Sequence, residues 1–293
     1  MYFRESILKG SVILLMMCSC SGKPTVREGL IDHYPDFSSN YVVSRNVEVF
    51  LPPEYSPDEK YDVLYMHDGQ NVFNPHTSYA GVAWEADKAL VKLLNEGKIR
   101  PAIIVAIWNS PHRLAEYMPN MPAGKIQEAL LAHGATDEIL SDRYLAFLVE
   151  ELKPFIDSTY STKAGPAHTH IMGSSMGGLI SFYALACYPE VFGSAACVST
   201  HWPALEGIFV DEVEGLLPST GNHRIYFDYG TATLDSLYEP FQLRVDSIMV
   251  NAGYVKNENW ITLRFDGAEH SEVAWKERVH IPLEFLLRKD IND

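Results

Sequence analysis

The chain has 293 residues, of which 47% are hydrophobic and 12% aromatic, and its formal net charge at pH 7 is −15. This hydrophobic content is ample for a packed core and excludes a chain that is disordered throughout. The negative charge argues against a nucleic-acid partner and against electrostatic attachment to an anionic membrane, because both need a basic surface.

Residues 1–20 are predicted to be a signal peptide of the lipoprotein type. Residues 12–17 form an apolar block that is far shorter than the roughly 20 residues of a membrane-spanning helix. The segment Met17-Cys18-Ser19-Cys20 that follows resembles a bacterial lipoprotein signal, with Cys20 as the residue that becomes lipidated. An ordinary signal peptide is the alternative. Both readings predict an exported protein. The lipoprotein reading predicts a protein of a bacterial envelope that is attached to a membrane only through a lipid anchor, and the ordinary signal peptide predicts a free protein.

The remaining chain divides into a tether and one domain. Residues 21–40 are polar and irregular, which predicts a tether, and residues 41–293 contain no Pro/Gly-rich linker that would split them. Residues 41–51 alternate apolar and polar, as in an exposed antiparallel strand. Buried strands are predicted at 61–66, 102–108, 168–172, 194–199, 224–227 and 260–265, and helices at 84–97, 141–160 and 272–288. This alternation predicts an α/β protein with a mainly parallel sheet, helices on both faces and an antiparallel start.

The cysteines and histidines point to neither a metal nor a cofactor. Cys187 and Cys197 are both expected to be buried single thiols, and a disulfide between them is the alternative in an oxidising compartment. His168 and His170 alternate on one predicted strand, but two histidines without a third ligand do not make a zinc site.

Residues 173–178 read Gly-Ser-Ser-Met-Gly-Gly, between an apolar strand-like run and an apolar helix-like run. This is the G-x-S-x-G nucleophile elbow in the setting that it requires, with Ser175 at its centre. The glycines are needed because the chain reverses so sharply that side chains at the flanking positions would collide. A structural Gly-rich turn is the alternative, and we favour a catalytic serine.

A serine hydroxyl needs a base to remove its proton and an acid to orient that base. His270 lies directly after the last predicted strand, where its imidazole can approach Ser175. For the acid, Asp235 is favoured because it follows a Gly-Thr turn after the penultimate strand. Asp228 and Glu239 remain alternatives.

The tetrahedral intermediate needs two hydrogen-bond donors for its oxyanion. One is the backbone N–H of Met176, the residue after the nucleophile. The other is expected in the loop His67-Asp-Gly-Gln70, where Gly69 lets the backbone approach closely and the N–H of Gln70 is the candidate donor.

Several segments together resemble the putative esterase family of α/β-hydrolases. They include 47–55, Met66-His-Asp-Gly-Gln-Asn71, 113–119, 147–156, the elbow and 267–275. This family includes enterochelin esterases, S-formylglutathione hydrolase and feruloyl and acetyl-xylan esterase domains. The resemblance implies the α/β-hydrolase fold and supports Gln70 as an oxyanion donor. One departure concerns the acid, because Thr233 stands where relatives often place it.

Five side chains on or near the loops around the site are candidate substrate contacts: Trp84, Trp108, Arg113, Tyr117 and Trp202. The aromatic rings could stack on sugars or hold an aryl acyl group, with core packing as the alternative. Arg113 could instead pair with Glu116.

The sequence therefore favours an exported serine carboxylesterase that acts on a small-molecule or carbohydrate ester, such as acetyl or feruloyl esters. A siderophore esterase of the enterochelin type ranks second, because a strongly acidic protein is a less natural partner for an anionic ferric catecholate. A non-catalytic, glycan-binding lipoprotein on a hydrolase scaffold is the alternative from another class.

Overall fold

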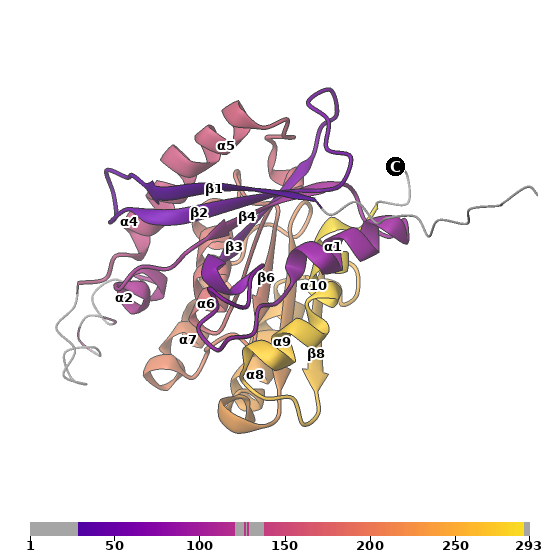
Figure 1. Ribbon diagram of the computed structural model, residues 1–293. Helices are drawn as coiled ribbons and strands as arrows, with labels where there is room; N and C mark the ends of the chain where they lie inside the picture. The colour runs from indigo at the N-terminus through magenta and orange to yellow at the C-terminus, as the bar shows by residue number, and fades with distance from the viewer. Residues whose placement is uncertain (1–28, 121–125, 127, 129–137, 290–293) are drawn as a thin grey trace, which may run out of the picture.

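The computed structural model describes residues 29–120, 126, 128 and 138–289. Eight strands form one sheet in the order β1-β2-β4-β3-β5-β6-β7-β8 (Figure 1). β1 (Leu30–Phe37) pairs antiparallel with β2 (Arg45–Leu51), and β2 pairs antiparallel with β4 (Ala102–Ile107). The other strands run parallel: β3 (Asp62–His67), β5 (Thr169–Ser174), β6 (Ser194–Val198), β7 (Arg224–Gly230) and β8 (Trp260–Phe265). The α/β-hydrolase fold expected from the sequence is confirmed.

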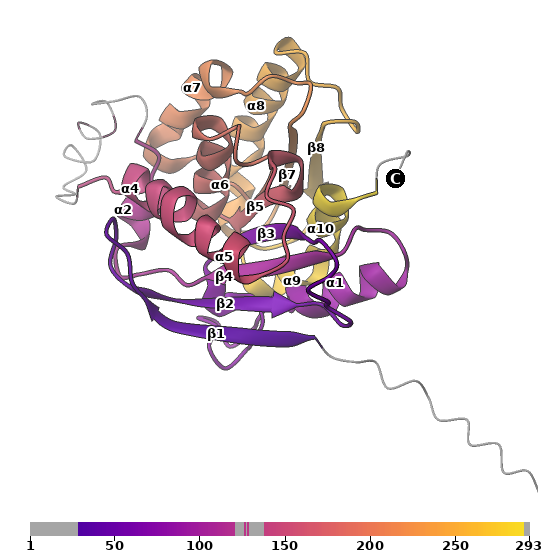
Figure 2. The ribbon, with the colours of Figure 1, turned by 90° about the horizontal axis from the view of Figure 1, so that it is seen from above.

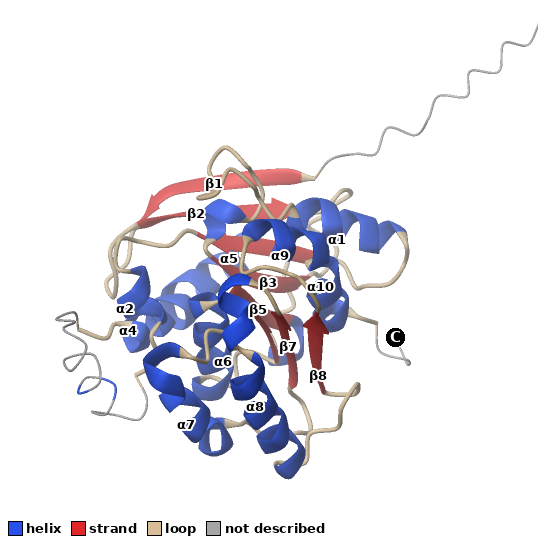
Figure 3. Cartoon of the chain, turned by 90° about the horizontal axis from the view of Figure 1, so that it is seen from below, coloured by secondary structure: helices blue, strands red, loops and turns tan. Residues whose placement is uncertain are grey.

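The two faces of the sheet bury separate hydrophobic cores, because side chains alternate along each strand. In β3, Val63 and Tyr65 belong to one core, and Leu64 and Met66 belong to the other. The first core is covered by α4 (Ser141–Ala146), α5 (Lys153–Thr159), α6 (Met176–Cys187), α7 (Ile208–Leu216) and α8 (Glu239–Asn251). The second is covered by α1 (Ala86–Asn95), α9 (Glu272–Arg278) and α10 (His280–Leu287). Figure 3 shows these helix groups on opposite sides of the strands.

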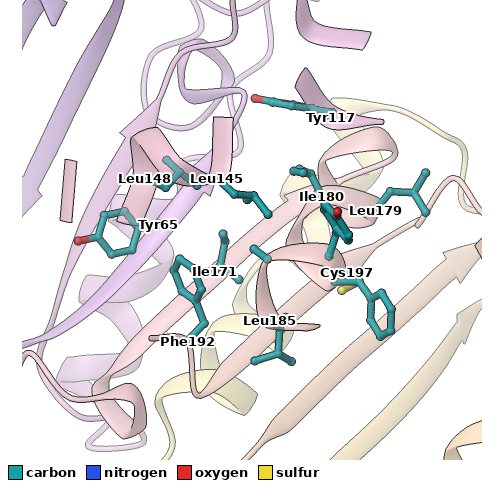
Figure 4. Packing of buried hydrophobic residues seen from close by; sticks show 14 of the residues in the cluster. Tyr65, Tyr117, Leu145, Leu148, Ile171, Leu179, Ile180, Leu185, Phe192 and Cys197 are labelled. Atoms are coloured by element: carbon teal, nitrogen blue, oxygen red, sulfur yellow. The ribbon is translucent and has the colours of Figure 1, made fainter. Parts of the chain in front are cut away.

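Helix α6 carries the densest part of the first core. Ten of its side chains or glycines, Met176 to Leu185, are buried, so the helix that follows the elbow is enclosed almost all round. Figure 4 shows Leu185 of this helix near Ile171 of β5 and Phe192, all members of the first core. This packing fixes the helix rigidly against the sheet.

The N-terminal part of the domain differs from the prediction. The predicted tether at 21–40 is wrong for Leu30–Phe37, because these residues form β1, the outermost strand (Figure 2). β2 is consequently not an exposed strand: β1 and β4 flank it on both sides, and most of its residues are buried. Residues 1–28, which include the predicted signal peptide and Cys20, lie outside the described residues.

Two predicted helices have internal breaks. The helix predicted at 141–160 consists of α4, a π-helical stretch over Phe147–Leu152, and α5. The helix predicted at 272–288 divides at Val279 into α9 and α10. None of the described helices combines the length and apolar character needed to cross a bilayer. Cys187 and Cys197 are free thiols, and the expectation that both are buried is wrong for Cys187, which is exposed.

Candidate active site

The elbow places Ser175 between β5 and α6. Its backbone has φ 58° and ψ −121°, a region that side-chain-bearing residues rarely occupy. A Cβ on Gly173 would lie 2.7 Å from the carbonyl oxygen of Gly177, which explains the glycine two residues before Ser175. The strained strand–turn–helix predicted from the sequence is therefore present.

The structure brings Ser175, His270 and Asp235 into one hydrogen-bonded line. The Nε2 atom of His270 lies 3.0 Å from the Ser175 hydroxyl, and its Nδ1 atom lies 2.6 Å from Oδ1 of Asp235. The backbone N–H of His270 donates to Oγ1 of Thr233 (2.8 Å). Thr233 thus holds the loop that carries His270. The line has the geometry of a nucleophile, its base and the group that orients the base.

The carboxylate of Asp235 is buried and fully engaged. Its second oxygen, Oδ2, accepts hydrogen bonds from the Ser199 hydroxyl and the Gly230 N–H, both at 2.6 Å. Burial alone would raise the pKa of Asp235, but the hydrogen bonds from His270, Ser199 and Gly230 outweigh it and lower that pKa. The carboxylate therefore stays ionised and can stabilise a protonated imidazole.

Ser199 links the Asp235 carboxylate to the helix that follows the loop of His270. Its hydroxyl oxygen accepts from the guanidinium of Arg278 (2.8 Å) and from the indole N–H of Trp275 (3.1 Å). Both donors lie on α9, the helix directly after the loop of His270. The Trp275 ring also contacts the imidazole of His270 edge-on, with 4.9 Å between ring centroids. The acid and the base are thus held by one helix.

The two alternative acids, Asp228 and Glu239, form hydrogen bonds and ion pairs with other residues. Asp228 is fully buried, and its carboxylate binds the guanidinium of Arg278, the Tyr226 hydroxyl and the backbone N–H of Ser199. Glu239 accepts from the Tyr229 hydroxyl at 3.3 Å and lies 3.4 Å from the guanidinium of Arg264. The carboxylate beside His270 is that of Asp235.

The candidate oxyanion loop follows β3, and hydrogen bonds of Asp68, the first residue after that strand, hold it in place. Both carboxylate oxygens of Asp68 accept from Arg113, at 2.6 and 2.7 Å, and Oδ1 also accepts from the Asn109 amide at 2.6 Å. The backbone N–H of Asp68 donates to the Tyr117 hydroxyl (3.2 Å), and the backbone N–H of Asn109 donates to Oε1 of Gln70 (3.2 Å). The loop therefore has a fixed shape.

The same loop lies against the elbow and the sheet. A Cβ on Gly69 would lie 2.6 Å from the backbone of Ala106 and Ile107, so only glycine lets the loop approach β4 this closely. A Cβ on Gly177 would lie 3.5 Å from Oδ2 of Asp68, which brings the loop beside the first turn of α6. Met176 begins α6, and the first N–H groups of a helix have no partner within the helix.

Of the four aromatic residues predicted to contact substrate, three are buried in the core and one, Trp108, remains a candidate. Tyr117 and Trp202 are essentially unexposed; Tyr117 binds Asp68, and the indole of Trp202 donates to Gln242 (2.9 Å). Trp84 is buried against Trp275, with ring centroids 5.7 Å apart. These three residues pack in the core, which is the alternative that the sequence left open for them. Trp108 is half-buried, and its contact with substrate stays a prediction.

The predicted pair of Arg113 and Glu116 is absent. Arg113 binds Asp68 with two hydrogen bonds, so its charge serves the candidate oxyanion loop. Glu116 instead forms a fully buried ion pair with Arg45, at 2.6 Å, and accepts from the Ser110 hydroxyl.

Sequence reasoning missed two sets of supporting residues. Thr233, Ser199, Trp275 and Arg278 hold the line, and Asp68 and Asn109 hold the candidate oxyanion loop. Their signal is their position directly after strands or on the helix after His270, but nothing in the residue types marks the contacts. In the described part of the chain, no group of three or more His, Cys, Asp or Glu side chains is arranged to hold a metal ion.

Comparison with protein families gives one match over most of the chain. A family model described as "Putative esterase" matches residues 38–282. An uncharacterized protein, YbbA, of Bacillus subtilis is 24% identical over 192 residues, which cover 64% of this chain and 68% of that protein. An endo-1,4-beta-xylanase/feruloyl esterase of Xylanibacter ruminicola is 25% identical over 187 residues, which cover 62% of this chain but only 22% of that enzyme.

Solved structures share the fold. An IroE-like serine hydrolase from Shewanella oneidensis superposes with a TM-score of 0.67 at 19% identity, covering 88% of this chain and 79% of that chain. The enterobactin esterase FES from Shigella flexneri superposes with a TM-score of 0.62 at 18% identity, covering 89% of this chain and 59% of that chain.

Proposed function

Because this chain belongs to the putative esterase family, whose model spans residues 38–282, we propose that it is a serine carboxylesterase that works through an acyl-enzyme. The observation that carries the proposal is the hydrogen-bonded line Ser175–His270–Asp235, with 3.0 Å and 2.6 Å between its members. Such a line supplies a nucleophile, a base and an orienting carboxylate in the arrangement that acyl transfer requires.

The proposed reaction has two halves. In the first, Nε2 of His270 takes the proton of Ser175 while Oγ attacks the ester carbonyl carbon, and the protonated imidazole then gives that proton to the departing alcohol. In the second, His270 activates a water molecule that attacks the acyl-enzyme, and the proton returns to Oγ as the acid leaves. Asp235 stabilises the imidazolium in both halves because its carboxylate stays ionised.

The oxyanion of each tetrahedral intermediate would bind the backbone N–H groups of Met176 and Gln70. Met176 occupies the first position of α6, next to Ser175. Gln70 lies in the loop that Asp68 and Arg113 hold beside the elbow. Each such donor typically contributes about 3–4 kcal/mol to transition-state stabilisation.

The direct test replaces the nucleophile. Ser175→Ala should abolish hydrolysis of p-nitrophenyl acetate and butyrate, and a fluorophosphonate probe should label the wild type but not this variant. Ser247→Ala, which removes an exposed hydroxyl on α8, is the matched control and should retain both properties. Undiminished turnover by Ser175→Ala would contradict the proposal. A wild type that is folded but neither labelled nor active would favour the glycan-binding alternative.

We place the substrate among acetyl or feruloyl esters of carbohydrate. The relative that combines a xylanase with a feruloyl esterase supports this class, and so does the half-buried Trp108 after β4. A siderophore ester is the second candidate, supported by the structural likeness to an enterobactin esterase. The net charge of −15 makes an anionic ferric catecholate the less favourable ligand. Turnover of methyl ferulate, acetylated xylan and a catecholate triester, compared on one preparation, separates the two candidates.

Export as a lipoprotein is a separate proposal that depends on Cys20. Acyl chains attach a protein to a bilayer by burying methylene groups, each worth about 0.8 kcal/mol. Cys20→Ala should therefore move the protein from the membrane fraction to the soluble fraction and abolish incorporation of labelled palmitate in a bacterial host. Cys187→Ala, which removes the exposed thiol of the folded domain, should change neither.

A further inference from the structure

A second imidazole, that of His201, lies beside the nucleophile and has no role in the reaction described above. His201 is in the loop after β6, and its backbone N–H donates to the carbonyl oxygen of Ser175 at 3.1 Å. The next residue, Trp202, is buried in the first core and donates to Gln242. The loop is therefore held on both sides of His201, and the imidazole has a defined place.

This imidazole binds the phenol of Tyr238, the residue before α8. Nδ1 of His201 lies 2.6 Å from the Tyr238 hydroxyl, which is within the range of a short hydrogen bond. The buried Tyr238 ring contacts two imidazoles, with its centroid 5.8 Å from that of His201 and 5.6 Å from that of His270. Ser175 contacts the same two residues, because its hydroxyl lies 3.0 Å from Nε2 of His270 and its carbonyl oxygen accepts from the N–H of His201. Its hydroxyl also opposes the rise in the pKa of Tyr238.

One placement of the protons gives a hydrogen-bond donor for every acceptor among Ser175, His270, Tyr238 and His201. His270 must accept from Ser175 at Nε2 and donate to Asp235 at Nδ1, since it is to act as a base. The Ser175 oxygen is then free to accept the phenolic proton of Tyr238. With the proton of His201 on Nδ1, that N–H donates to the Tyr238 oxygen and leaves the phenolic O–H free to point toward Ser175.

We propose that Tyr238 is a further catalytic residue, whose hydroxyl donates to Oγ of Ser175 as that oxygen gains negative charge, and that His201 is the residue that positions it. This inference rests on the proposed esterase function. No additional proton is transferred: the proton of Ser175 still goes to His270, and Tyr238 keeps its own. A hydrogen bond to a charged oxygen is roughly twice as strong as one to a neutral oxygen, so the bond favours the transition state over the resting hydroxyl.

The electrostatic surroundings agree with these protonation states. Burial and then the negative charge of Asp235 raise the pKa of Tyr238, against a smaller opposing effect of the Ser175 hydroxyl. Burial and then the positive charges of His270 and Arg113 lower the pKa of His201, against the charge of Asp235. The phenol is therefore protonated at neutral pH, and the His201 imidazole is neutral.

The test measures the reactivity of Ser175 itself, as the second-order rate constant for labelling by a fluorophosphonate. Tyr238→Phe keeps the ring and removes the hydroxyl, and this rate constant and kcat should each fall roughly 5- to 30-fold, with KM little changed. His201→Ala should lower both about 3- to 10-fold. His201→Asn, whose amide nitrogen can replace Nδ1, should restore them to within about twofold of the wild type.

Two controls separate this role from a structural one. Tyr254→Phe removes another buried phenol, which donates to the Pro218 carbonyl, and should label at the wild-type rate. The final labelling stoichiometry should stay at the wild-type value in every variant, because the change concerns rate and not the folded fraction. The inference would be overturned if Tyr238→Phe were labelled as fast as the wild type, or if only its labelling stoichiometry fell. Neither result would bear on the esterase function, which Ser175→Ala tests separately. A wild type that does not label at all would refute the esterase function instead.

Discussion

His67, the last residue of β3, should make the folded protein sensitive to mild acid. The residue is 4% exposed; Nδ1 lies 2.8 Å from the Tyr144 hydroxyl, and Nε2 is buried without a hydrogen-bond partner among the described residues. Burial lowers the pKa of His67 to about 3, with the positive charges of Arg113 and Arg45 adding to the effect and Asp68 opposing it. The native state therefore keeps this imidazole neutral well below the pH at which the unfolded chain protonates it.

The sign and size of the effect follow from proton linkage. The folded pKa is depressed, so the contribution to stability is fully present above the unfolded pKa of about 6.5 and is lost as the pH falls toward about 3. Within that window the loss approaches about 1.4 kcal/mol per pH unit, which amounts to about 2 kcal/mol between pH 7 and pH 5. This difference in stability depends little on the pKa of His67 in the folded protein, because pH 5 lies well above that pKa.

The assay is urea unfolding, followed by tryptophan fluorescence, at pH 7 and pH 5. His67→Gln removes the titrating group and can still bind Tyr144, so its free energy of unfolding should fall about 2 kcal/mol less than that of the wild type over this interval. His280→Gln, at the exposed start of α10, is the matched control and should behave as the wild type does. Equal losses in the wild type and His67→Gln would refute the reasoning, whatever the absolute stability of the variant.

Three further predictions concern the site and its scaffold. Asp235→Asn should lower kcat on p-nitrophenyl butyrate by about 10³- to 10⁴-fold, since the imidazole loses the carboxylate that orients it, and a loss under tenfold would contradict the assignment. Gly69→Ala should lower kcat/KM about 10²-fold, because the new methyl group would lie 2.6 Å from the β4 backbone and force the candidate oxyanion loop away; an unchanged value would exclude Gln70 as a donor. Asp62→Asn should cost about 3–5 kcal/mol of unfolding free energy in urea, because the fully buried carboxylate binds Arg100 at 2.8 Å and His168 at 2.9 Å; a change under 1 kcal/mol would contradict this.

The sequence by itself determined what depends on residues close together in the chain. The alternation of short apolar runs with helices predicted the parallel sheet, because burial on both faces imposes that pattern. The elbow around Ser175 was readable for the same reason: the steric demand for glycine at 173 comes from the backbone of Gly177, only four residues further along the chain. His270 was identifiable by its place directly after the last strand.

Only the tertiary structure decided which groups meet across the sheet. Asp228 lies within β7 and Asp235 follows that strand, and the choice between them depends on Arg278 of α9, which binds Asp228 and leaves Asp235 to His270. Arg113 is separated from Asp68 by 45 positions, and no local pattern announces their contact. β1 escaped prediction because an edge strand buries little, so its sequence need not alternate. Contacts between distant segments depend on how whole elements pack, and that packing leaves no periodic trace in the chain.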